Sequence, residues 1–314
     1  MARQAAALPR ILVSLGRSRQ WAEALRRLGP AKDLGPEALQ RLNAGISACR
    51  LGAAWQAALA LFRHLLHEGP APDQFTFSSA ILAACAKESS RWQLALAMME
   101  AMPSYRVAPN AAVCNAAIIG LEHAGRWQEA LHLFGAMDTI RVAANLISLN
   151  ATIAACSSSS RWQPALALLK AAPESLGRST VSFNTAITAC GRAAQWRRSL
   201  VLLEELRVLV PFDSGQGQRL LVPRVASPGE ATGLVVLLRG CNATLSACER
   251  AACWREALQL LSAMADGGAQ WPLPDVVSFN ASISACEKAL SWDWALATLR
   301  RAGQKKKADA IGLN

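Results

Sequence analysis

The sequence is built from one short segment that recurs at intervals of about 35 residues. In the copy Asn150 to Cys156, an Asn opens the segment, an Ile stands three residues later and an Ala-Cys pair closes it. A Trp follows twelve residues after the Asn, here Trp162. A unit of this length cannot bury its apolar faces alone, so repeated units must stack on one another. Further copies begin at Asn43, Asn115, Asn184, Asn242 and Asn280.

One more copy lacks the Asn. We align Ser78 with it, because the preceding Asp-Gln-Phe-Thr-Phe matches the Asp-Val-Val-Ser-Phe before Asn280, although Trp92 then comes fourteen residues later. Aligning Ser79 instead would keep Cys85 in register. The longer match favours Ser78.

Each unit contains two amphipathic stripes. Ile147, Leu149 and Ile153 lie at helical spacing, Ser residues then interrupt the pattern, and Trp162 opens a second stripe. Pro followed by Asp or Asn closes several units, because Pro cannot continue a helix and the next residue can cap a new one. The sequence therefore predicts an all-α fold, a superhelical α-solenoid of about seven helix-turn-helix repeats.

One stretch interrupts the repeats. Residues 208–234 have many Gly and Pro and no helical stripe, so we expect a flexible inserted loop there. Repeats are expected over residues 35–207 and 235–303, with a basic tail at 304–314. Residues 1–34 are rich in Arg and carry no acid before Glu23, which is typical of a transit peptide, but they also fit a partial first repeat.

The composition narrows the function classes. Apolar residues make up 52% of the chain and charged residues 18%, so the chain can form a continuous core. The net charge of +11 favours an anionic partner. No apolar run is long enough to cross a bilayer. The nine Cys include no C-x-x-C pair and mostly follow Ala, which indicates packing in a reducing compartment. Trp at the start of the second helix is expected to fill the gap between units.

Two roles are open for the recurring Asn on residues alone. An Asn amide is costly in a core, so a row of them facing a groove would offer donors and acceptors to a base. The alternative is that each Asn caps or braces its helix, a role that Asn also favours.

No catalytic, metal or cofactor motif is present. His64, His67, His123 and His132 form no H-E-x-x-H pattern, and no phosphate-binding G-x-x-x-x-G-K occurs. We therefore expect no enzyme activity, no cofactor and no metal site.

The sequence pattern of the repeat resembles that of a known family. The segment from Pro274 to Cys286 reads Pro-Asp-Val-Val-Ser-Phe-Asn-Ala-Ser-Ile-Ser-Ala-Cys, and Trp-x-x-Ala-Leu follows in most copies. This resembles the pentatricopeptide repeat over about residues 35 to 305, in a Trp-rich variant that looks like that of dinoflagellate algae. The tetratricopeptide repeat fits less well, because there the Trp opens the first helix.

The resemblance implies binding of single-stranded RNA in mitochondria or plastids, with about one base read per repeat. It also implies that the early helix residue and the residue preceding the next repeat choose the base together. Asn with Asp implies uracil, Ser with Asn adenine, and Asn with Asn or Ser a pyrimidine leaning to cytosine. The expected strand is 5′-U-A-Y-C-N-U-3′, where Y is a pyrimidine. The base-reading pairs are Asn43 with Asp73, Ser78 with Asn110, Asn115 with Asn145, Asn150 with Ser179, and Asn242 with Asp275, while Asn184 and Asn280 have no assigned second member.

The resemblance assigns two further roles. A side chain three residues before the Asn wedges between bases. A basic side chain eight residues after the Asn contacts the phosphate backbone. The expected wedges are Phe75, Ile147, Val181 and Val277, and the expected phosphate contacts are Arg192, Arg250 and Lys288. Gln40, Ala112 and Arg239 stand at wedge positions and should grip less well.

We therefore expect a monomeric RNA-binding protein that acts in organelle RNA processing, stability, editing or translation, together with other RNA-processing proteins and without a membrane. A cytoplasmic or nuclear location is the alternative. The alternative function is a helical-repeat scaffold for protein partners, which would show a groove lined by Leu, Met and Trp.

Overall fold

A computed structural model describes residues 2–28, 38–85, 91–172, 179–209, 228–266 and 271–300 of the chain. Every regular element within these ranges is a helix, which confirms the all-α prediction. Residues 210–227 of the expected insert and the expected tail 304–314 lie outside the described residues.

The helices alternate between two kinds. The first helix of each repeat, helix A, carries the Asn position. These helices are α1 (Ala2–Arg17), α3 (Ala38–Leu51), α5 (Gln74–Ala84), α7 (Ala111–His123), α9 (Leu146–Ser158), α11 (Thr180–Arg192), α13 (Pro228–Arg250) and α15 (Val276–Lys288). The second, helix B, begins at the Trp; these helices are α2 (Trp21–Leu28), α4 (Trp55–Glu68), α6 (Trp92–Ala101) followed by the 3₁₀ turn Met102–Tyr105, α8 (Trp127–Thr139), α10 (Trp162–Ala171), α12 (Trp196–Leu209), α14 (Trp254–Asp266) and residues 292–300.

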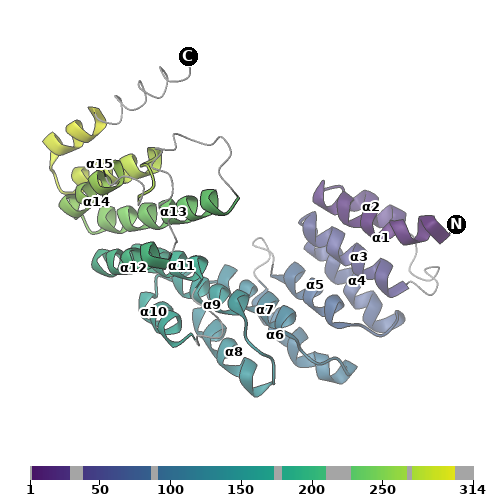
Figure 1. The fold of residues 1–314 in the computed structure, drawn as a ribbon. Helices are drawn as coiled ribbons and strands as arrows, with labels where there is room; N and C mark the ends of the chain where they lie inside the picture. The colour runs from purple at the N-terminus through teal and green to yellow at the C-terminus, as the bar shows by residue number, and fades with distance from the viewer. Residues whose placement is uncertain are drawn as a thin grey trace, which may run out of the picture. The chain divides into compact units, whose positions relative to one another are not determined.

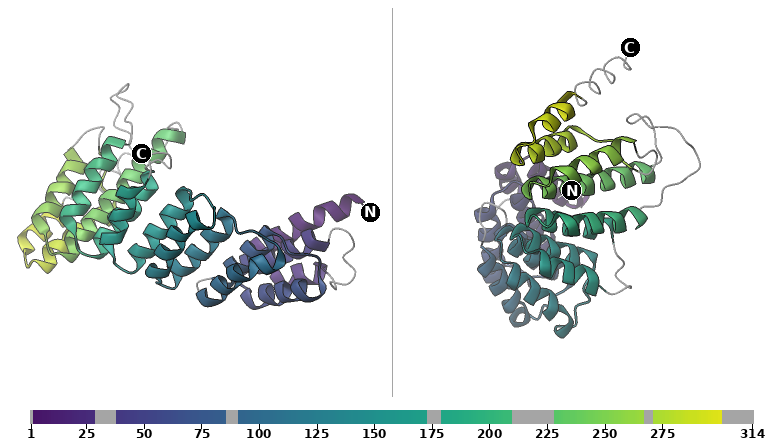
Figure 2. Two further views of the ribbon diagram at one scale, coloured as in Figure 1. Left: turned by 90° about the horizontal axis from the view of Figure 1, so that it is seen from below. Right: turned by 90° about the vertical axis from the view of Figure 1, so that its left-hand side faces the viewer.

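The chain forms two compact units, Met1–Ala155 and Cys156–Asn314. In the first, α1 packs on α3, α3 on α5 and α5 on α7, so the A helices make a continuous row with the B helices beside them (Figure 1). In the second, α11, α13 and α15 make the same kind of row (Figure 2). Each unit is thus a stack of helical hairpins, as the period of about 35 residues predicts.

Close packing explains the small residues of helix A. A Cβ added at Gly120 of α7 would lie 2.0 Å from Sγ of Cys85 at the end of α5. A Cβ at Gly191 of α11 would lie 2.9 Å from the backbone oxygen of Ala243 in α13. Neighbouring A helices therefore approach closely, and larger side chains at these positions would force them apart.

The turn between the two helices of a hairpin has one fixed conformation. The residue two positions before the Trp has a left-handed backbone, with φ of 61° at Ala53, 67° at Gly125, 55° at Ala194 and 53° at Ala252. Gly tolerates this conformation better than residues with a Cβ. Only the turn at Gly125 uses Gly, so the tertiary stack imposes the conformation on the others.

The Trp rings are less buried than expected for side chains that fill the gap between neighbouring hairpins. Trp55, Trp92 and Trp162 are partly exposed. A guanidinium of the next hairpin lies over each ring, with Arg91 4.2 Å from the centroid of Trp55 and Arg198 3.7 Å from that of Trp162. The Trp therefore joins neighbouring hairpins at the edge of the stack, through a cation–π contact in addition to apolar packing.

Both ends of the range expected for the insert, 208–234, are helical. Residues 208–209 end α12, and residues 228–234 form the first turns of α13, which has 23 residues where α11 and α15 have 13 each. This extension could not be predicted from the sequence, because its Gly and Pro residues do not give a helical stripe.

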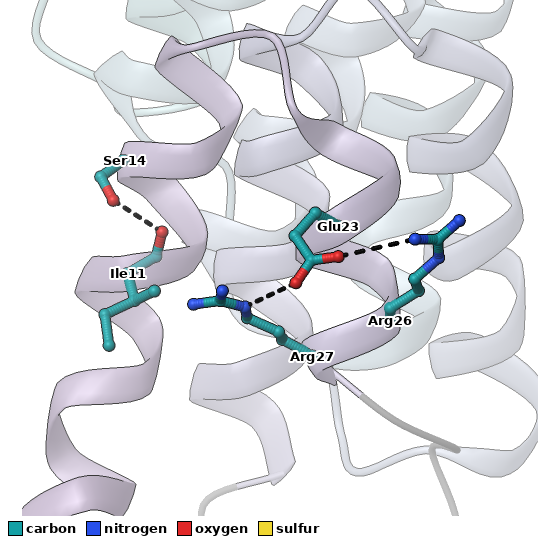
Figure 3. A network of polar contacts seen from close by, with 5 residues as sticks. All are labelled: Ile11, Ser14, Glu23, Arg26 and Arg27. Carbon is teal, nitrogen blue, oxygen red and sulfur yellow. Dashed lines mark hydrogen bonds and ion pairs between the residues drawn. The ribbon is translucent and has the colours of Figure 1, made fainter.

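The first hairpin is formed by residues that also fitted a transit peptide. Glu23, in the first turn of α2, makes ion pairs with Arg26 and Arg27 one turn later, and Ser14 Oγ donates to the backbone oxygen of Ile11 in α1 (Figure 3). Among the described helices, none is both long and apolar enough to cross a membrane.

Candidate nucleic-acid interface

The second member of each predicted base-reading pair caps a helix A. Asp73, Asn110, Ser179 and Asp275 are N-cap residues whose side chains accept a hydrogen bond from the backbone N–H three residues later. Asn145 does the same, accepting from Ser148 N at 3.0 Å. Such caps satisfy the free N–H groups of the first turn, so the position of each side chain is fixed by the helix it starts.

In the first of these pairs, the amide and the cap bond to each other. Asn43 Nδ2 donates to Asp73 Oδ1 at 3.2 Å, and Asn43 Oδ1 accepts from Thr76 Oγ1 at 2.7 Å. Asp73 Oδ1 also accepts from Thr76 N at 2.7 Å. The three side chains come from consecutive A helices and form one network.

The same network occurs at two other hairpins. Asn115 Nδ2 donates to Asn145 Oδ1 at 3.3 Å, and Ser148 Oγ donates to Asn115 Oδ1 at 2.5 Å. In the second unit, Asn242 Nδ2 lies 3.2 Å from each carboxylate oxygen of Asp275, and Ser278 Oγ donates to Asn242 Oδ1 at 2.6 Å.

Two of these Asn side chains are more buried than expected for a row of amides that face an open groove. Asn43 and Asn115 are 6% and 7% exposed, Asn242 is partly exposed and Asn280 is exposed. Bracing between hairpins, the alternative role for the Asn, is therefore part of what these side chains do. Asn150 is partly exposed in α9, and its predicted partner Ser179 belongs to the other compact unit.

The Ser78 hairpin has a different arrangement. Ser78 Oγ donates to the backbone oxygen of Phe75, and Asn110 Nδ2 donates to Gln74 Oε1 at 2.7 Å. The residue three positions after the cap is Val113, which has no hydroxyl to offer.

The Asn184 hairpin has no cap network. Asn184 Nδ2 donates to the backbone oxygen of Val236 in the extended helix α13, at 2.9 Å. Its Oδ1 is buried and has no hydrogen-bond partner among the described residues. Gly240 stands where the other networks have Ser or Thr, and a Cβ added there would lie 2.9 Å from that Oδ1.

The four predicted wedges share one environment. Phe75, Ile147, Val181 and Val277 are 55%, 59%, 55% and 54% exposed, whereas the next residue but one along each helix is buried. These four A helices therefore each keep one apolar side chain in solvent at the same register.

Two hollows in the first unit share Phe75 and Asp73 in their lining. One, of about 620 Å³, is lined by Asn43 and Asp73; the other, of about 420 Å³, is lined by Ser78 and Asn110. Phe75 lines both. The structure thus places two predicted base-reading pairs at consecutive hollows that share the predicted wedge, and both volumes fall in the range of small-ligand sites, about 300–1,000 Å³.

Basic side chains near these positions differ in availability. Arg192 donates to the backbone oxygen of Ser157, and Lys288 pairs with Glu249 at 2.8 Å. Arg250 is exposed. Arg10 and Arg17 of α1 line the larger hollow. Their place could not be predicted from the repeat, because α1 has Pro9 where most other A helices have Asn.

The buried thiols are unreactive in their surroundings. Burial raises the pKa of Cys85 and Cys248 to about 12 and that of Cys49 and Cys190 to about 11. They therefore stay protonated at neutral pH, and the described residues contain no group of three or more His, Cys, Asp or Glu that could hold a metal ion.

In each compact unit the fold and site define a stack of helical hairpins, and four A helices, α5, α9, α11 and α15, begin with a capping side chain followed by an exposed apolar one. The sequence model described as the PPR repeat matches residues 112–142 and 181–209, which are the hairpins α7–α8 and α11–α12. These two hairpins therefore match the pentatricopeptide repeat, and most of the other hairpins carry an Asn and a Trp at the same positions.

Solved structures show similar chains. The PPR domain of Arabidopsis thaliana protein-only RNase P 1, in complex with tRNA, is 19% identical with a TM-score of 0.45, over 55% of this chain and 91% of that one. The pentatricopeptide repeat protein PPR10, in complex with an 18-nucleotide psaJ RNA element, is 18% identical with a TM-score of 0.48, over 96% of this chain and 49% of that one. The chain spans about half the length of PPR10. No curated protein sequence matches the chain.

Proposed function

We propose that the protein binds single-stranded RNA along the A helices of its two units, with about one base facing each capped polar pair. The observation that carries this proposal is that two hollows in the first unit share the exposed side chain of Phe75. Two spaces of ligand size, each lined by a polar pair, share one exposed aromatic ring. Unpaired bases stack on aromatic side chains and are read by hydrogen bonds to their edges.

The lining of the hollows argues for RNA over a peptide partner. Asn43, Asp73, Ser78 and Asn110 supply donors and acceptors, and Arg10 and Arg17 supply positive charge to the larger hollow. A peptide groove would be lined chiefly by large apolar side chains. The net charge of +11 adds long-range attraction for a polyanion.

The wider role follows from the same proposal. We propose that the protein acts in RNA processing, stability, editing or translation in a mitochondrion or plastid, without catalysis of its own. Other RNA-processing proteins would carry out any cleavage or modification.

Selection from a pool of randomised single strands tests the proposal. We expect the full chain to enrich 5′-U-A-Y-C-N-U-3′, with affinity that falls with salt at a log-log slope of about −2 to −4, as for three to five phosphate contacts. Enrichment of purine tracts, or no enrichment, would contradict it. Replacing Asn43 and Asp73 together by Ser and Asn, the pair found at Ser78 and Asn110, should change the first base from uracil to adenine and leave the others unchanged.

A further inference from the structure

The presence of a hydroxyl three residues after the cap coincides with an Asn in the preceding helix A that is held in a network. Thr76, Ser148 and Ser278 each donate to the Oδ1 of such an Asn. Where the preceding residue is Ser78, the position holds Val113. Where it holds Gly240, the Oδ1 of Asn184 is left without a partner among the described residues.

The orientation of each networked amide follows from groups that can only donate or only accept. The Asp73 carboxylate only accepts, so the nitrogen of Asn43 must face it and the oxygen must face Thr76. The same holds for Asn242 between Asp275 and Ser278.

At the third network, the backbone fixes both amides. Ser148 N–H only donates, so Oδ1 of Asn145 must face it, and the nitrogen of Asn115 must then face that oxygen. The hydroxyl of Ser148 accepts from the backbone N–H of Asn145 at 3.3 Å, and the nearer acceptor for its own proton is Asn115 Oδ1 at 2.5 Å, against 3.1 Å for Asn145 Oδ1.

The remaining hydrogen-bonding capacity of each pair is then determined. An Asn nitrogen carries two protons, of which one is used by the cap, so each networked amide retains a donor and no readily available acceptor. An Asp cap retains a carboxylate oxygen as an acceptor, whereas the Asn145 cap retains only its own N–H donors.

We propose that Thr76, Ser148 and Ser278 are positioning residues for base choice, because they hold each Asn amide as a hydrogen-bond donor. This inference rests on the proposed function. The Asn115 and Asn145 pair presents two donors, and cytosine alone has two adjacent acceptors, O2 and N3, on its pairing edge. This hairpin therefore selects cytosine over uracil, whose two carbonyls are separated by an N–H.

The proposal also explains the other networks. Asn43 with Asp73, and Asn242 with Asp275, present a donor beside an acceptor, which matches a uracil carbonyl beside N3–H. Asn184 reads no base, because its nitrogen is bonded to Val236 O and its Oδ1 is buried behind Gly240.

The experiment measures binding of the full chain to strands that differ only at the nucleotide of the Asn115 hairpin. We expect about tenfold tighter binding with cytosine than with uracil, the usual discrimination of one good hydrogen-bonded pair. In Ser148→Ala the ratio should fall to about twofold or less, because the released Oδ1 of Asn115 can rotate and accept from uracil N3–H. Ser148→Thr should restore the ratio.

Internal controls separate base choice from stability. Ser148→Ala should leave the uracil preference at the Asn43 nucleotide unchanged. If the variant were unfolded, this preference would be lost as well. Should Ser148→Ala not fold, Ser278→Ala tests the same effect at the Asn242 nucleotide. The wild-type chain should show no preference at the Asn184 nucleotide. Binding with an unchanged cytosine preference in the folded Ser148→Ala variant overturns this inference alone, whereas absence of binding to any RNA overturns the proposed function.

Discussion

At the scale of single residues, the contact between Arg and Trp is what sequence reasoning least expected. Tryptophan at a helix start suggested core packing, yet the rings lie at the edge with a guanidinium over the face. Part of the signal was present in the sequence, because Arg91 and Arg126 each directly precede the next Trp, whereas Arg198 lies two residues after Trp196. The contact was missed because only the spacing between neighbouring hairpins shows that an Arg near one Trp reaches the Trp of the preceding hairpin.

A double-mutant cycle on Arg198 and Trp162 tests the contact. The guanidinium lies 3.7 Å from the ring centroid, so we expect a coupling energy of about 0.5–1 kcal/mol, as for partly exposed cation–π pairs. Unfolding by denaturant of Arg198→Ala, Trp162→Leu and the double variant measures it. Strictly additive effects on the free energy of unfolding would show that the ring contributes packing alone.

The site residues could be predicted in part. Asn and cap positions follow from the repeated spacing, and the structure bonds Asn43 to Asp73, Asn115 to Asn145 and Asn242 to Asp275. The burial of Asn43 and Asn115 could not be predicted, because it depends on how closely neighbouring A helices approach. The role of Thr76, Ser148 and Ser278 was missed, since Ser or Thr near a helix start reads simply as capping.

At the scale of elements, the turn between helices A and B shows tertiary packing overriding local preference. Ala252 adopts a φ of 53°, although a residue with a Cβ is strained there. The stack must supply the free energy that holds this turn.

Ala252→Gly should therefore stabilise the protein. Gly removes the strain, partly offset by the larger entropy of the unfolded chain, so we expect a gain of about 0.5–1 kcal/mol. Thermal or denaturant unfolding measures it. The matched control is Ala251→Gly at the neighbouring position, which should destabilise; equal effects of the two substitutions would contradict the role of the left-handed turn.

Helix boundaries were predicted well where capping residues mark them. Asp73 and Asp275 begin α5 and α15, and each forms a capping box with the residue three positions later. At α13 no such residue is present, because Leu237 and Gly240 occupy the cap and hydroxyl positions. The helix accordingly runs on from Pro228, into residues that the sequence analysis assigned to the insert.

At the scale of the whole molecule, buried thiols make stability depend on pH. Burial raises the pKa of Cys85, Cys241 and Cys248 to about 12, well above that of an exposed thiol. Above about pH 9 the unfolded chain loses these protons while the folded chain keeps them, so the unfolded state binds fewer protons and stability falls as pH rises. Below that pH these groups contribute no pH dependence.

We therefore expect the free energy of unfolding to decline steadily between pH 9 and the folded pKa values of about 11 to 12. Denaturant unfolding at pH 8 and pH 10 checks this. Cys85→Ala should reduce the slope, whereas replacing the less buried Cys253 should leave it nearly unchanged. A stability that is flat over this range would show that the thiols are accessible to water in the native state.

The described contacts join each hairpin only to its neighbours. Side-chain hydrogen bonds between hairpins connect residues about 30 to 40 positions apart, and 52 at the insertion. Because such short separations demand little loop closure, each unit should fold quickly for its length. Damage should also remain local, since a hairpin that opens withdraws support only from the hairpins on either side.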